Sequence, residues 1–296
     1  MKKILLSAVA LVAAMSVNAQ VFQMNAEAQG ITSDLTNVDA GKVWADVDFA
    51  TISNPFATQH KMVDCKNNDY VKVLIDGNEI VSAGGVQGND NPKDADGGNP
   101  AQTLLPATSG AVIQINAKAD GWMYIVGKLS SNKQYVAFEE GKAIGYKLAM
   151  EISDARFPDN KINLELKGEG EFNYIPEGRK IDWVVREVLG DAEAATAGNG
   201  LGVIYFPVFT GCKYYAHATG SKISWCGAYF SATEASSIKV AKEDGTEFEL
   251  LGATGIENVK AAKTAAENVA YNLAGQKVGN DFKGLVIVNG QKMIRK

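Results

Sequence analysis

The chain is poor in the residues that carry most enzyme chemistry. Its 296 residues include only two histidines, His60 and His217, and three cysteines. It contains no H-E-x-x-H, G-x-S-x-G, C-x-x-C or P-loop pattern. The composition therefore gives no support to a zinc-protease, serine-hydrolase, dithiol or nucleotide-hydrolase site, and we assign no catalytic residue, no metal ligand and no cofactor.

The chain also lacks an apolar run of about 20 residues, the length that a membrane-spanning helix needs. Its longest apolar stretch, Ile4–Val17, follows two lysines and ends in the small-x-small pattern Val17-Asn18-Ala19. This arrangement is typical of a secretory signal peptide over residues 1–19, cleaved before Gln20. The residue directly after the cleavage point is Gln20 and not a cysteine, so we expect a soluble exported protein without a lipid anchor or a transmembrane segment.

An excess of basic residues is absent as well. The whole chain carries a net charge of −5, and loss of the two lysines in residues 1–19 leaves 27 basic against 34 acidic residues, or −7. A mildly acidic protein offers no electrostatic attraction for nucleic acid or for an anionic membrane. We therefore expect neither as a partner.

An odd number of cysteines leaves at least one thiol unpaired within a monomer. Cys212 and Cys226 flank an expected hairpin that turns at Gly220-Ser221, and its register places Cys212 opposite Tyr229. The two sulfurs would then lie on opposite faces, too far apart for a disulfide. We expect these two residues not to be bonded, and Cys65 to be either a free buried thiol or a partner.

The body of the chain, residues 20–251, predicts one all-β domain with a β-sandwich or jelly-roll fold. Short runs rich in Val, Ile, Tyr, Phe and Trp alternate with Gly, Asn, Asp and Pro, and no convincing helix interrupts them. The expected strands are Val43–Phe49, Val71–Ile75, Glu79–Ser82, Val112–Ala117, Gly121–Leu129, Tyr135–Phe138, Ile162–Leu166, Trp183–Leu189, Gly202–Phe209, Lys213–Thr219, Ile223–Phe230 and Ile238–Ala241.

Two other stretches have the composition of loops. Gln87–Thr103 is rich in Gly, Asn, Asp and Pro. Its Asp90, Asp94 and Asp96 do not have the spacing of an EF-hand calcium loop, so we expect a solvated loop there, although calcium loops of other spacing remain open. Residues 252–268 are polar and alanine-rich, as in a linker.

The last segment, residues 269–296, predicts a small β-module. Its expected strands are Ala270–Leu273, Leu285–Val288 and Lys292–Ile294, with an Asn-Gly hairpin turn between the last two. The order Y-N-L-x-G-Q-K-V, a spacer and K-G-x-x-I-V-N-G-x-K resembles the type A C-terminal sorting domains of the type IX secretion route in Bacteroidetes. That resemblance implies secretion machinery as a partner of the tail. The protein would then reside in the periplasm, on the outer cell surface or outside the cell.

Within the body, Val203–Phe230 carries a G-x-x-Y pattern, a G-S-K turn and a closing G-x-x-F strand. It resembles the last strands of the carbohydrate-binding-like jelly rolls found in secreted Bacteroidetes proteins. It departs from them in having Cys212 and Cys226, and no catalytic domain accompanies it. The resemblance implies a fold and, less directly, a polysaccharide or surface glycan as ligand.

Sugar binding uses exposed aromatic rings that stack on the apolar face of a pyranose. Period-two alternation places Trp122 on one face with Tyr124 and Val126, but it does not say which face is exposed. Packing in the core is the alternative for each aromatic residue, including Trp44. The candidate ligand-binding residues are Trp122, Tyr124, Tyr146, Trp183, Tyr214 and Trp225.

These observations favour a non-catalytic surface or secreted protein that binds glycan or another extracellular macromolecule. A structural or adhesive surface component is the alternative. A polysaccharide-active enzyme is the third hypothesis, because glycosidases need only two suitably spaced carboxyl groups, and Glu139-Glu140 or Glu169/Glu171 are such pairs in sequence.

Overall fold

The computed structural model describes residues 20–103, 105–129, 135–152, 161–166, 200–218, 223–252, 270–272, 277–278, 284–288 and 291–295. The predicted signal peptide, the linker of residues 252–268 apart from Gly252, and the expected strand Trp183–Leu189 lie outside these ranges. The chain divides into two compact units, Met1–Gly252 and Ala253–Lys296.

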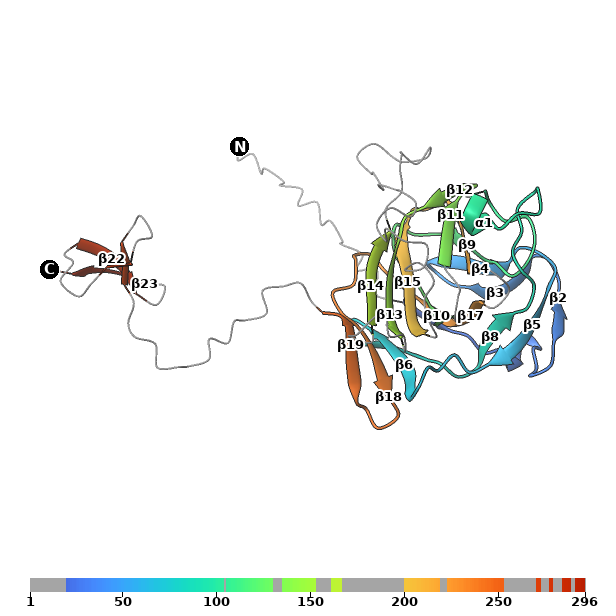
Figure 1. Ribbon diagram of the computed structural model, residues 1–296, viewed down its shortest axis with the longest axis horizontal. Helices are drawn as coiled ribbons and strands as arrows, with labels where there is room; N and C mark the ends of the chain where they lie inside the picture. The colour runs from blue at the N-terminus through green and yellow to red at the C-terminus, as the bar shows by residue number, and fades with distance from the viewer. Residues whose placement is uncertain are drawn as a thin grey trace, which may run out of the picture. The chain divides into compact units, whose positions relative to one another are not determined.

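The described part of the first unit is almost entirely antiparallel β-structure, which confirms the all-β, sandwich-like prediction (Figure 1). The jelly-roll strand order stays a prediction. The largest sheet has nine strands, in the order β14 (Lys161–Leu166), β13 (Tyr146–Ile152), β15 (Gly200–Val208), β10 (Gly121–Leu129), β17 (Ile223–Ser231), β8 (Gly85–Gly88), β5 (Thr58–Val63) and β2 (Thr36–Val38), with β1 (Gln20–Gln23) also paired to β17.

Two smaller sheets complete this unit. The six-stranded sheet has the order β12 (Lys142–Ile144), β11 (Tyr135–Glu139), β16 (Lys213–Ala218), β9 (Ile113–Ala117), β4 (Ala50–Asn54) and β3 (Lys42–Asp46). The four-stranded sheet has the order β19 (Glu247–Leu251), β18 (Ile238–Lys242), β6 (Tyr70–Ile75) and β7 (Asn78–Val81). The described helices are a 3-10 turn, η1 (Glu27–Gln29), and α1 (Pro100–Thr103), which lies within the expected loop.

Alternate residues of the central strands face two different cores. In β10, Met123 and Ile125 belong to the core that also contains Ile115 of the six-stranded sheet. Tyr124 and Val126 belong to the core shared with the four-stranded sheet. The nine-stranded sheet is therefore the middle layer of three, and its central strands are apolar on both faces because neither face contacts water.

Two sequence expectations about hairpins had opposite outcomes. The residues Asp76-Gly77-Asn78 between two expected strands are a hairpin signal, and the hairpin is present: Asp76 and Gly77, with φ values of 46° and 80°, join β6 to β7, while Asn78 is already the first residue of β7. The expected hairpin between Lys213–Thr219 and Ile223–Phe230 is wrong. β16 pairs with β11 and β9, whereas β17 pairs with β10, β1 and β8 in another sheet. Strand partners depend on distant contacts that a local turn signal does not encode.

The three cysteines are buried and unbonded. The prediction that Cys212 and Cys226 are not paired is confirmed, although the register argument behind it was wrong, because Cys226 lies on β17 and Cys212 directly precedes β16 of another sheet. Cys65 and Cys226 lie in the core shared with the four-stranded sheet. Cys212 lies in the other core.

The second unit is a sheet with the order β21 (Lys277–Val278), β20 (Ala270–Asn272), β22 (Gly284–Val288) and β23 (Gln291–Arg295). The three strands expected from the sequence are present, and the short β21 was missed. Val288 pairs with Gln291, as a two-residue connection requires. Four strands allow this unit to satisfy most of its backbone hydrogen bonds internally.

Candidate functional site

A polar pocket with a volume of about 410 Å³ opens where two distant segments meet. Strand β6 pairs with β18, and this pairing sets Tyr70 opposite Lys242. The segment that precedes β6 and the turn that follows β18 therefore lie next to each other. The pocket is lined by Lys66, Asn68, Asp69, Val71, Lys242, Glu243 and Asp244.

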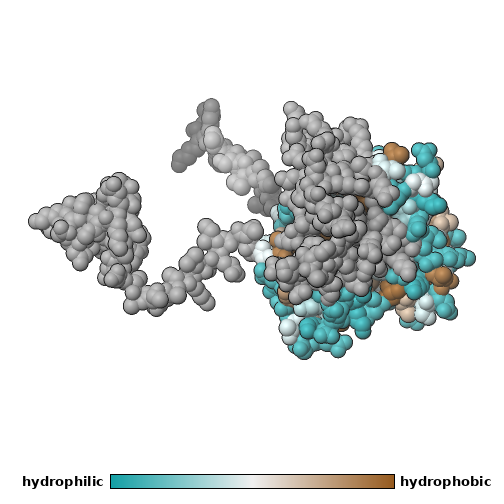
Figure 2. All heavy atoms as spheres, viewed as in Figure 1, coloured by the Kyte–Doolittle hydropathy of each residue, from teal (hydrophilic) through white to brown (hydrophobic). Residues whose placement is uncertain are grey.

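The pocket combines both signs of charge. Lys242 Nζ lies 3.1 Å from Asp69 Oδ2, and this hydrogen bond raises the pKa of the lysine. The same ammonium group lies 5.4 Å from the centroid of the Tyr70 ring. Asp244 accepts a hydrogen bond of 2.8 Å from the backbone N–H of Thr246, which lowers the pKa of its carboxyl group. The lining therefore presents charged donors and acceptors side by side. In Figure 2 the lower part of the body, where Figure 1 places β6 and β18, is largely hydrophilic.

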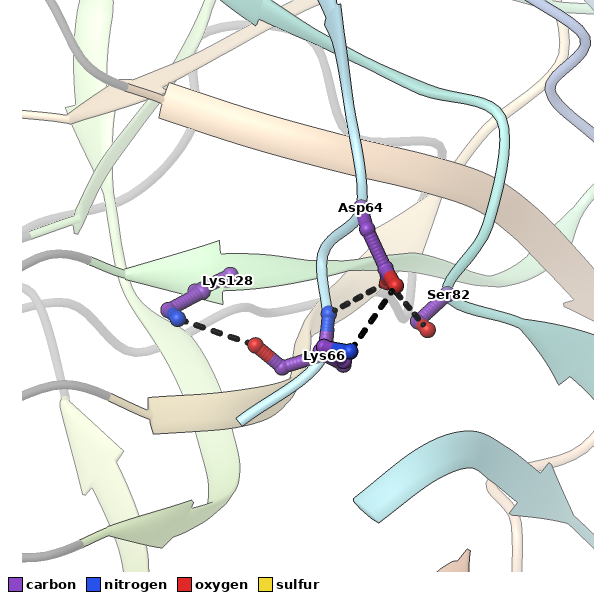
Figure 3. Close-up of polar contacts among 4 residues, drawn as sticks. All are labelled: Asp64, Lys66, Ser82 and Lys128. Carbon is purple, nitrogen blue, oxygen red and sulfur yellow. Dashed lines mark hydrogen bonds and ion pairs between the residues drawn. The ribbon is translucent and has the colours of Figure 1, made fainter. Parts of the chain in front are cut away.

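The segment between β5 and β6 is held in place by a small polar network (Figure 3). Asp64 Oδ1 accepts hydrogen bonds from the backbone N–H of Lys66 at 2.9 Å and from Ser82 Oγ at 2.7 Å. Lys128 Nζ, from β10, donates to the Lys66 carbonyl at 2.9 Å. One wall of the pocket is thus anchored to the middle sheet.

A buried carboxylate also anchors the segment that forms this wall. Glu151, on β13, is 3% exposed and accepts hydrogen bonds from Asn67 Nδ2 at 2.6 Å and Asn68 Nδ2 at 2.8 Å. Asn68 has a φ of 50°, a left-handed conformation that asparagine tolerates better than most residues. Burial raises the pKa of Glu151, and the two amides oppose that effect. The hydrogen bonds orient Asn68 at the edge of the pocket.

The described lining residues are lysines, acids, an asparagine and a valine. They include no histidine, cysteine or serine, and the two histidines lie elsewhere. His60 makes an edge contact with Trp44 at 5.4 Å, and His217 stacks on Phe138 at 5.8 Å. Burial lowers the pKa of each to about 4, so both are neutral at physiological pH. His217 is fully buried in β16.

The described residues contain no cluster of three or more histidine, cysteine or acidic side chains arranged to hold a metal ion. The Gln87–Thr103 segment is more ordered than a solvated loop. Asp94 is 3% exposed and accepts hydrogen bonds from Asp96 N, Gly98 N and Thr103 Oγ1. Asp90 accepts from Thr58 Oγ1. Asp94 thus holds the segment's own backbone, whereas Asp90 ties the segment to β5.

The paired acids considered for glycosidase chemistry do not form a site in the described residues. Glu139 is 3% exposed, and its carboxyl group contacts Cys212 and Tyr214. Glu140 is exposed at a turn with a φ of 42°. Glu169 and Glu171 lie outside the described ranges.

The six aromatic residues named from sequence differ in how far the structure buries them. Four of them, Tyr124, Tyr146, Tyr214 and Trp225, are between 0% and 6% exposed, so they pack in the cores and offer no open stacking surface. Trp122 is half-buried and shares the Tyr124 and Val126 face, as expected from alternation. Trp183 lies outside the described residues, and Trp44 is buried.

Comparison with family models, with curated proteins and with solved structures finds no match to this chain. No helix in the described ranges has the length and apolar composition needed to cross a membrane.

Sequence reasoning missed the pocket residues. Asn67-Asn68-Asp69 and Glu243-Asp244-Gly245 both have turn composition, and that is the only local signal. Their meeting depends on the β6–β18 pairing, which joins segments about 170 residues apart in sequence.

Proposed function

We propose that this protein is an exported, non-catalytic β-sandwich protein that binds a glycan in the polar pocket. The observation that carries the proposal is the composition of the lining, in which lysines, an amide and carboxylates surround a volume of about 410 Å³. Pockets of this size are typical of small-ligand sites.

The chemistry of the lining favours a neutral polyhydroxylated ligand. Each sugar hydroxyl both donates and accepts a hydrogen bond, so it matches a wall of ammonium, amide and carboxylate groups. Two lysines face three acids, which leaves a formal charge of −1 and no strong attraction for a highly charged ligand. Val71 adds an apolar side chain to the same lining.

Export, a jelly-roll strand order and contact of the tail with secretion machinery belong to the same proposal. The leader pattern of residues 1–19 supports export, and the resemblance of residues 269–296 to sorting domains supports a role for the tail in it. Localisation of the full chain and of a chain ending at Ala270 in the native host tests the role of the tail in export. Retention of only the shortened form in the periplasm is expected, and equal localisation of both forms would refute that role.

The binding test uses the mature chain from Gln20 against a panel of immobilised neutral and acidic polysaccharides, followed by calorimetry with the best oligosaccharide. Lys242→Ala removes a pocket ammonium group. Lys239→Ala is the matched control, because it lies on the same strand and pairs with Glu247 at 2.7 Å but is not part of the lining.

We expect Lys242→Ala to weaken binding at least tenfold and Lys239→Ala to leave it unchanged. Tenfold corresponds to about 1.4 kcal/mol, close to the lower end of the range of about 1.5–3 kcal/mol for a hydrogen bond to a charged group. Absence of binding to every polysaccharide, or equal loss in both variants, would refute glycan binding in this pocket.

A further inference from the structure

Two of the three cysteines lie together although they are far apart in sequence. Val63 of β5 is opposite Gly85 of β8, and Trp225 of β17 is opposite Val86. Continuing the second ladder by one residue places Cys226 beside Gly85. Cys65, two residues beyond Val63, therefore approaches Gly85 on the same face of the sheet as Cys226.

Gly85 makes room for the Cys65 sulfur. A Cβ atom built on Gly85 would lie 2.7 Å from Cys65 Sγ and 3.3 Å from the Cβ of Cys226. Both cysteines are 0% exposed, and their side chains approach each other beside Gly85 within one core. The Cys226 thiol also donates to the Val126 carbonyl at 3.6 Å. Cys212 lies in the other core.

We propose that Cys65 and Cys226 are a redox-active pair that forms an intramolecular disulfide when the protein meets a disulfide oxidant. The convergence of the two buried side chains on the space beside Gly85 carries this inference. It extends the proposed function, because Cys65 belongs to the segment that carries pocket residues Lys66 and Asn68.

The reaction takes two exchange steps. The Cys65 thiolate attacks a small-molecule or protein disulfide, R–S–S–R, and forms a mixed disulfide while releasing one R–SH. The Cys226 thiolate then attacks the Cys65 sulfur and releases the second R–SH. Two electrons pass from the protein to the oxidant, and the two thiol protons end on the two R–SH molecules. The product joins the segment before β6 to β17 in the middle sheet.

Burial makes this pair slow to react. The hydrogen bond to Cys65 and burial both raise the pKa of Cys226 well above its ordinary value, so little thiolate is present. Oxidation therefore requires transient opening of the segment between β5 and β6, which lies outside the strands.

The test is to incubate the reduced mature chain with oxidised glutathione at pH 8, in buffer and in urea below the unfolding midpoint. Remaining thiols are then alkylated under denaturing conditions and counted by intact mass. We expect the count to fall from three to one in at least one of these conditions, with a peptide containing Cys65 linked to one containing Cys226. In the Cys212→Ser variant the count of free thiols should fall from two to none. The Cys65→Ser and Cys226→Ser variants should form no intramolecular bridge.

Three free thiols under all conditions, glutathione adducts without a bridge, or a bridge to Cys212 would overturn the proposal. Hydrogen exchange supplies a second readout, since the bridge should slow exchange in residues 64–69 and reduction should restore it. The oxidation state of protein recovered from the host tests export separately. A bridge that forms in vitro but is absent in the host would count against export and not against the pair.

Discussion

The two buried histidines should make the protein sensitive to mild acid, and His217 provides the clearest test. Its ring is fully buried on β16, stacks on Phe138, and has no hydrogen-bond partner at Nε2. Burial lowers its pKa from 6.5 to about 4. Below pH 6.5 this imidazole binds a proton in the unfolded chain but stays neutral in the folded chain. The free energy of unfolding therefore decreases as the pH falls toward 4.

The size of the effect follows from those two pKa values. A group with pKa 6.5 when unfolded and about 4 when folded loses about 2 kcal/mol of stability between pH 7 and pH 5. His60, whose pKa is also lowered to about 4 by burial, adds a similar loss. The wild-type protein should therefore lose about 4 kcal/mol from these two groups over that interval.

The assay is urea denaturation followed by tryptophan fluorescence at several pH values from 7.5 to 5. His217→Gln cannot titrate in this range, so its free energy of unfolding should fall by about 2 kcal/mol less than that of the wild type between pH 7 and pH 5. Contributions from carboxyl groups cancel in this comparison, because both proteins retain them. Identical pH dependence in wild type and variant would refute the reasoning, whatever the absolute stability of the variant.

Three further predictions concern other parts of the fold. Burial raises the pKa of Glu139, so Glu139→Gln should be more stable than the wild type at pH 7.5. This advantage should shrink toward pH 4, where the carboxyl group is largely protonated in the folded and the unfolded state. An advantage that persists at pH 4 would contradict this. Gly202→Ala should lower the free energy of unfolding by about 3 kcal/mol or more, because the new Cβ would lie 2.1 Å from the Ala149 carbonyl oxygen. Gly97→Ala, which has open space but a φ of 80°, should cost about 1–2 kcal/mol, and equal losses would refute the steric argument. Deletion of Tyr271–Lys296 should shift the thermal unfolding midpoint of the first unit by less than about 2 °C in calorimetry, because the two units are separately compact. A large shift would show that the tail is part of the first unit's fold.

The strands could be predicted from sequence because their signals are local. The bounds of β10 were predicted as Gly121–Leu129, and the turn at Asp76-Gly77 was identified from residues that tolerate positive φ. Alternation also placed Trp122, Tyr124 and Val126 on one face. Short strands such as β2 and β8 were missed, since three or four residues carry too little pattern to stand out. The longer strands β5 and β13 were missed as well.

The sequence by itself thus determined the all-β class, most strand positions and the presence of a separate β-module at the end of the chain, because hydrophobic alternation and turn residues act over a few neighbours. Only the tertiary structure decided which strands pair, and so it overturned the hairpin expected between β16 and β17. It also decided that Tyr214 and Trp225 are buried and that Asn68 and Asp244 line one pocket. These outcomes depend on contacts between residues far apart in the sequence, where the burial of apolar surface across three layers selects one arrangement among many that are locally equivalent.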